Sequence, residues 1–84
     1  MAKYRFTPRA SKEFFKLDPV IQERIISKLD YYCSTEFPTW FARHLTDNTL
    51  GQYRFRVGDY RIICDIDEDG IRVVRIGHRR DIHK

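Results

Sequence analysis

Hydrophobic and polar residues alternate with a period of two at the start of the chain. Tyr4 and Phe6 alternate with Lys3 and Arg5, so one side of this segment is apolar and the other is charged. That alternation is typical of a strand that buries one face. We therefore expect a short first strand that ends before Thr7.

The period then changes to that of a helix. Thr7-Pro8 is a helix start, with threonine as the N-cap and proline in the first turn, and the apolar spacing that follows predicts a helix over about 8–17. Asp18-Pro19 repeats the same signal. It begins a longer amphipathic stretch, which predicts a second helix that ends near Ser34. The short link between the helices predicts that they form a hairpin.

Residues 35–50 are expected to be mostly irregular, and the period of two returns from Gln52 onward. Gly58-Asp59 and the segment 67–70 are turn sequences, and they divide the rest of the chain into three strands. The last strand, IRVVRI, is apolar on both faces in places, so its register stays open. The order β-α-α-β-β-β in one domain, 1–84, predicts an α+β fold, a mostly antiparallel sheet with a two-helix hairpin packed on one face.

Composition adds few constraints on function. Hydrophobic residues make up 42% and charged residues 33%, as in a folded globular domain. No apolar run approaches the length of a membrane span, and the first ten residues lack the apolar core of a signal peptide, so we expect a cytoplasmic protein without a membrane partner. Cys33 and Cys64 have no metal-ligand spacing; they fit small core residues better than a disulfide.

The net charge of +4 favours a polyanionic partner only weakly. A site for such a partner would depend on how the charges are arranged in space. A two-residue turn at Gly58-Asp59 sets Val57 opposite Tyr60 and Arg56 opposite Arg61. Arg54, Arg56 and Arg61 then share one face of the sheet, away from the helices. This face is either an ordinary solvated surface or a phosphate-binding surface of rigidly held guanidinium groups.

The C-terminal segment GHRRDIHK follows the last strand and supplies further polar groups. His78 and His83 can titrate near neutral pH, so they are candidate acid–base groups, while surface or tail positions are the alternative. Arg79 and Arg80 add two guanidinium groups to the same end of the chain.

The segments YRFTPRASKEFFKLDP, VGDYR and GHRR together resemble the RelE/ParE superfamily of toxins from type II toxin–antitoxin systems, and specifically its RelE-like branch. The resemblance covers nearly the whole chain except about 35–50. It implies an mRNA interferase, a ribosome-dependent endoribonuclease that cleaves mRNA in the ribosomal A site and thereby inhibits translation. It also implies a cognate antitoxin as partner, and a reaction in which a 2′-hydroxyl attacks the adjacent phosphate without a metal or cofactor.

Carried over by position, the resemblance makes Arg61 a phosphate ligand in the transition state and Arg79 the residue that assists the leaving 5′-oxygen. Arg54, Arg56 and Arg80 are the expected substrate phosphate-binding residues. Arg54 stands where some relatives have a lysine base, and His83 stands where many have a tyrosine. Because arginine stays protonated, we expect the proton transfer to fall to His78 or His83.

Two other functions remain open. A ParE-like toxin would use the same fold to inhibit DNA gyrase and would have no hydrolytic site. A catalytically silent module would bind nucleic acid or an antitoxin only. Relatives of the ParE type generally lack a convergent basic cluster, so the arginines favour the ribonuclease.

Overall fold

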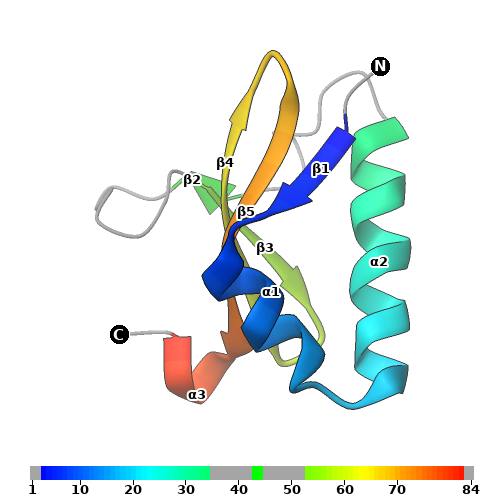
Figure 1. Ribbon diagram of the computed structural model, residues 1–84, viewed down its shortest axis with the longest axis vertical. Helices are drawn as coiled ribbons and strands as arrows, with labels where there is room; N and C mark the ends of the chain where they lie inside the picture. Colours follow the sequence, from blue (N-terminus) through cyan, green and yellow to red (C-terminus); the bar gives the residue numbers. More distant parts are fainter. Residues whose placement is uncertain (1–2, 35–42, 45–52, 83–84) are drawn as a thin grey trace.

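The computed structural model describes residues 3–34, 43–44 and 53–82 (Figure 1). The elements are β1 (Lys3–Phe6), α1 (Pro8–Phe15), α2 (Pro19–Ser34), β2 (Arg43–His44), β3 (Tyr53–Val57), β4 (Tyr60–Asp67), β5 (Gly70–His78) and α3 (Arg79–Ile82). The predicted order β-α-α-β-β-β is confirmed. Two short elements, β2 and α3, are additions that the pattern of the sequence did not indicate.

Both predicted helix starts have the expected capping bonds. The hydroxyl of Thr7 accepts a hydrogen bond from the backbone N–H of Ala10 at 3.2 Å, and Pro8 occupies the first turn of α1. The Asp18 carboxylate accepts one from the N–H of Val20 at 3.0 Å. Each cap satisfies a donor that the helix itself leaves free, so these two residues fix where the helices begin.

The sheet has five strands in the order β1-β5-β4-β3-β2. β1 is parallel to β5, and the other pairs are antiparallel. The predicted register of the hairpin between β3 and β4 is confirmed, with Val57 opposite Tyr60 and Arg56 opposite Arg61. The register that the sequence left open contains a β-bulge, because Ile63 pairs with Arg75 whereas Cys64 pairs with Val73.

Helices α1 and α2 cover one face of the sheet, and the core lies between them (Figure 1). The helices contribute buried residues at helical spacing, and the strands contribute every second residue except across the bulge in β5. The core residues are Ala10, Phe14, Ile25, Leu29, Tyr32, Cys33, Phe55, Val57, Ile62, Cys64, Ile71, Val73 and Ile76. Both cysteines are therefore free core residues, as predicted. No helix in the described part of the chain is long and apolar enough to cross a membrane.

Helix α1 completes the edge of β5 that β1 leaves uncovered. Just after β1, the backbone N–H of Thr7 donates a hydrogen bond to the carbonyl of Val73 in β5 at 2.9 Å. Further along, the Glu13 carboxylate accepts hydrogen bonds from the N–H of Ile76 at 2.9 Å and from the Arg75 guanidinium at 3.0 Å. A side chain of α1 thus replaces the missing strand partner.

Candidate phosphate-binding site

The face of the sheet opposite the helices carries the predicted arginines. Arg56 lies directly opposite Arg61, and Arg54 lies opposite Ile63. On the other side of β4, Arg61 pairs with Gly77 of β5. Paired residues point to the same face of a sheet, so the hairpin register brings these three guanidinium groups together as the sequence predicted.

Arg61 is buried, with only 7% of its surface exposed. Its Nη1 group donates long hydrogen bonds of 3.4 Å to the carbonyl of Gly58 in the hairpin turn and to that of Tyr60 at the start of β4. Its Nε group is buried and has no hydrogen-bond partner in the described part of the chain. The alternative of a solvated arginine is thus wrong for Arg61, although it fits the exposed Arg56.

The burial and the neighbouring charges both act on this guanidinium. Burial lowers the pKa of Arg61, and the positive charges of Arg56, Arg54 and Arg79 lower this pKa further, in that order. The Asp59 carboxylate opposes them with a smaller effect. Arginine nevertheless stays protonated at neutral pH. The Arg61 guanidinium is therefore a permanent cation whose charge is disfavoured by burial and by the nearby positive charges. An anion bound here would relieve both penalties.

Arg54, Arg56, Arg61 and Arg79 differ from four other arginines of the described chain in having no ion pair with a carboxylate. Four other arginines each lie within 4 Å of a carboxylate, in the pairs Arg5–Asp67, Arg9–Glu13, Arg72–Asp65 and Arg75–Glu13. No such ion pair is found for Arg54, Arg56, Arg61 or Arg79 within residues 3–34, 43–44 and 53–82. We call these four residues the arginine cluster. The Asp59 carboxylate offsets part of its charge through a smaller effect on Arg61, and the cluster stays net positive, as a phosphate site requires.

Helix α3 positions Arg79, the one member of the cluster that does not come from β3 or β4. The N–H of Arg79 donates a 2.8 Å hydrogen bond to the carbonyl of Asp59, which ties the start of α3 to the turn between β3 and β4. Ile82 of the same helix is buried, and it lies where a β-carbon on Gly77 would be 3.6 Å from its own β-carbon. That distance is an ordinary van der Waals contact, so Ile82 of α3 packs directly over Gly77, which is the residue paired with Arg61.

The structure does not bring His78 onto this face. His78 pairs with Tyr60, and their rings meet edge to face with centroids 5.4 Å apart, so His78 lies on the side of the sheet that carries the helices. Its Nδ1 accepts a hydrogen bond from the N–H of Arg80 at 3.2 Å. Arg80 itself is exposed and is not among the residues that act on Arg61. His83 lies outside the described residues.

Sequence reasoning missed the burial of Arg61 and the residues that cause it. The signal was present in the pattern, since Ile63 interrupts the charged face and Gly77 stands opposite Arg61. Both indicate a partly covered face rather than a solvated one. For metals, no group of three or more histidine, cysteine, aspartate or glutamate side chains suited to an ion occurs among the residues that the structure describes.

The fold and the cluster together define a small α+β protein with a basic, partly enclosed face on its sheet. A family model described as "ParE toxin of type II toxin-antitoxin system, parDE" matches residues 4–83, and the chain thus belongs to this toxin family. The resemblance to the RelE/ParE superfamily is thereby confirmed. No curated protein matches the sequence.

Two solved structures share the fold. The toxin–antitoxin complex RelBE2 from Mycobacterium tuberculosis contains a chain that is 24% identical, with a TM-score of 0.73, and the match covers 93% of this chain and 98% of that one. The RelB–RelE antitoxin–toxin complex from Methanococcus jannaschii contains one that is 22% identical, with a TM-score of 0.72 and 93% of each chain covered. At such identities the likeness concerns the fold.

Proposed function

We propose that this toxin is a ribosome-dependent endoribonuclease that cleaves mRNA in the cytoplasm and is neutralised by a cognate antitoxin. One observation carries the proposal. Three guanidinium groups, those of Arg54, Arg56 and Arg79, surround the buried Arg61, and none of the four forms an ion pair with a carboxylate in the described ranges. A toxin that only bound a protein would not need this net positive charge, whereas a phosphodiester provides the missing anion.

The proposed reaction needs no metal. The 2′-hydroxyl gives its proton to a base as its oxygen forms a bond to the adjacent phosphorus. The bond from phosphorus to the 5′-oxygen breaks, and this oxygen takes up a proton from solvent, which leaves a 2′,3′-cyclic phosphate and a free 5′-hydroxyl. Negative charge grows on the non-bridging oxygens as this happens. Arg61 with Arg54 and Arg56 would stabilise that charge, as donors of an oxyanion hole do, and Arg79 would assist the departing 5′-oxygen.

The proton of the 2′-hydroxyl needs a base other than arginine. His78 is a poor candidate, because it lies on the Tyr60 side of the sheet and its Nδ1 already accepts a hydrogen bond. We therefore propose His83 for the proton transfer, from its place in the sequence. His83→Ala should slow single-turnover cleavage by about 10²–10⁴, and His78→Ala should have little effect. If neither substitution changes the rate, histidine catalysis is wrong.

Induced expression followed by mapping of mRNA 5′ ends tests the ribonuclease directly. Cuts within translated codons are expected for the wild type. Arg61→Ala should reduce the cleavage rate by about 10²–10³, since it removes a transition-state donor. Arg72→Ala is the matched control, because Arg72 is also a sheet arginine but is paired with Asp65. Equal activity of Arg61→Ala and Arg72→Ala would overturn the role of the cluster.

Inhibition of DNA gyrase is the second candidate, and membership of the ParE toxin family favours it. A gyrase inhibitor should block supercoiling by purified gyrase and should cause DNA damage while mRNA stays intact. That outcome would replace the ribonuclease proposal. A protein that does neither, but still binds its antitoxin, would be the catalytically silent module.

A further inference from the structure

A second basic surface lies across the hairpin turn from the arginine cluster. It is an open hollow of about 500 Å³ between α2 and the end of β3. The helix lines it with Val20, Glu23, Arg24, Ser27 and Lys28, and the strand and turn line it with Val57 and Gly58. The hollow is on the helix side of the sheet, so it is not part of the arginine cluster described above.

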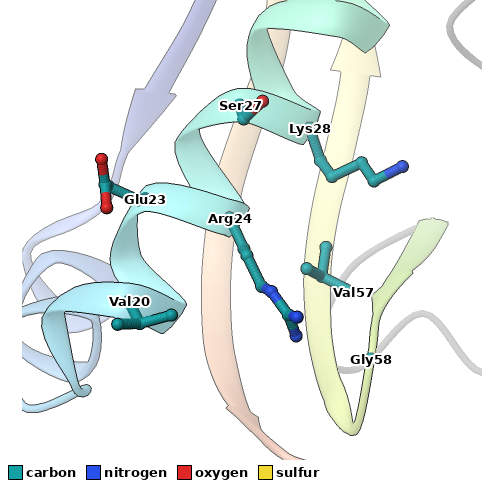
Figure 2. Close-up of a pocket in the computed structure, with 7 residues that line it drawn as sticks. All are labelled: Val20, Glu23, Arg24, Ser27, Lys28, Val57 and Gly58. Atoms are coloured by element: carbon teal, nitrogen blue, oxygen red, sulfur yellow. The ribbon is translucent and has the colours of Figure 1, made fainter.

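The charges in this hollow point to an anion. Figure 2 shows the Arg24 side chain extending from α2 toward the turn and Lys28 on the same side of the helix, while the Glu23 carboxylate points away from both. Neither Arg24 nor Lys28 forms an ion pair within the described ranges. They are four residues apart, and like charges at this spacing destabilise a helix. A bound anion would offset that repulsion.

The turn joins the hollow to the cluster. Gly58 has a positive φ of 59°, and a β-carbon there would lie 3.9 Å from Nη1 of Arg24. From the other face, Arg61 donates to the carbonyl of the same residue. One glycine is therefore close to a guanidinium on each side of the sheet. Successive phosphates of a single RNA strand that crosses the turn could contact both groups.

We infer that Arg24 and Lys28 form a second phosphate subsite, which holds the RNA backbone next to the scissile phosphate. The inference rests on the proposed ribonuclease function and extends it. A phosphodiester fits better than an acidic protein segment, because the hollow combines two unpaired cations and the Ser27 hydroxyl with a site one turn away that already suits phosphate. Arg24 would be a binding residue that touches no reacting atom.

Binding of a short single-stranded RNA with 2′-O-methyl groups tests this inference, because such an RNA has no nucleophile and is not cleaved. Fluorescence anisotropy should be measured over a series of NaCl concentrations. Arg24→Gln should weaken binding about tenfold at low salt. It should also reduce the slope of log K against log salt by about 0.7, the value for one lost phosphate contact on a single strand.

Lys12→Gln is the matched control, because it removes the same charge from an exposed helical position away from the hollow. In ribosomal cleavage, Arg24→Gln should raise KM and leave kcat unchanged, since the contacted phosphate does not react. The inference is overturned if Arg24→Gln and Lys12→Gln behave alike in both assays while Arg61→Ala loses cleavage; the proposed function then stands. It is also overturned if Arg24→Gln weakens only antitoxin binding. A wild type without RNA cleavage or RNA binding would refute both.

Discussion

At the scale of single residues, Arg61 shows a conflict between stability and function. Its guanidinium is buried, is surrounded by like charges, and keeps one N–H group without a partner in the described chain. Each of these features disfavours the folded state. Their coincidence at one residue is typical of a site where binding is favoured at the expense of stability.

We expect Arg61→Met to increase the free energy of unfolding by about 1 kcal/mol while toxicity is lost. Methionine has a long flexible apolar side chain that can occupy the same space without the charge. Urea denaturation measures the change, and the half-exposed Arg72→Met should stay within about 0.5 kcal/mol of the wild type. If Arg61→Met is instead destabilised, the long bonds from Arg61 to the turn carbonyls hold the hairpin together.

The buried Cys64 thiol should make the free energy of unfolding depend on pH. Burial raises the pKa of this thiol strongly, and the charges of Asp65 and Cys33 raise it further. Above about pH 8.5 an unfolded chain would ionise the thiol while the folded chain keeps it neutral, so the folded state binds more protons. The free energy of unfolding should therefore fall as pH rises from about 8.5 to about 10, by at most about 1.4 kcal/mol per pH unit for this group.

Urea titrations at several pH values measure this slope. Cys64→Ala will be less stable throughout because it leaves a cavity, but its stability should depend less on pH than that of the wild type. The same slope in both proteins would show that other groups, such as Cys33, whose pKa burial also raises, determine the alkaline behaviour.

At the scale of elements, the sequence predicts a structural feature correctly where one residue or one short turn determines it. Thr7 and Asp18 fix the helix starts through their own side chains. Gly58-Asp59 fixes the hairpin register, and with it the shared face of the arginines. The bulge between Val73 and Arg75 and the placement of His78 could not be predicted in this way. Both depend on how β5 pairs with two neighbours at once, which is a long-range property.

Glu13 is the residue through which α1 is attached to the edge of β5. Its carboxylate accepts hydrogen bonds from the Arg75 guanidinium and from the N–H of Ile76. The Arg75 side chain is only one-fifth exposed. Glu13→Ala leaves both donors without their partner, so we expect a loss of about 2 kcal/mol in the free energy of unfolding.

Chemical denaturation again provides the measurement, and Arg9→Ala is the control. Arg9 contacts the same carboxylate from an exposed position at 3.9 Å, and a pair of that kind contributes at most about 1 kcal/mol. The loss in the free energy of unfolding for Glu13→Gln should lie between those for Glu13→Ala and Arg9→Ala. The amide oxygen can still accept a hydrogen bond from the N–H of Ile76, but the negative charge is gone. Equal effects of Glu13→Ala and Arg9→Ala would contradict the edge role of Glu13.

At the scale of the whole molecule, the positive charges fall into two populations. Some arginines are paired with carboxylates, as at Arg5–Asp67 and Arg72–Asp65. Others are unpaired and lie near the turn between β3 and β4, on both faces of the sheet. Unpaired arginines therefore lie close together at this turn, although each half of the sequence carries the same net charge. Repulsion among these unpaired arginines should therefore make the stability of the protein depend on salt.

We expect added NaCl to raise the melting temperature of the free toxin, because salt screens repulsion between exposed arginines more than it weakens the exposed ion pairs. Relief of up to about 1 kcal/mol corresponds to roughly 4–8 °C in a domain of this size. The double variant Arg54→Gln/Arg56→Gln should show a smaller rise. A melting temperature that falls with salt would mean that the paired arginines dominate stability.

Sulfate separates simple screening from occupation of the phosphate site. At equal ionic strength, sulfate should stabilise the wild type more than chloride does, since a bound anion adds a mass-action term that grows with its concentration. Sulfate also stabilises proteins by exclusion from their surface, and this part should be the same in the double variant. The excess seen only in the wild type is the contribution of the arginine cluster. If no excess remains after that comparison, the guanidinium groups do not form an anion site in the free toxin.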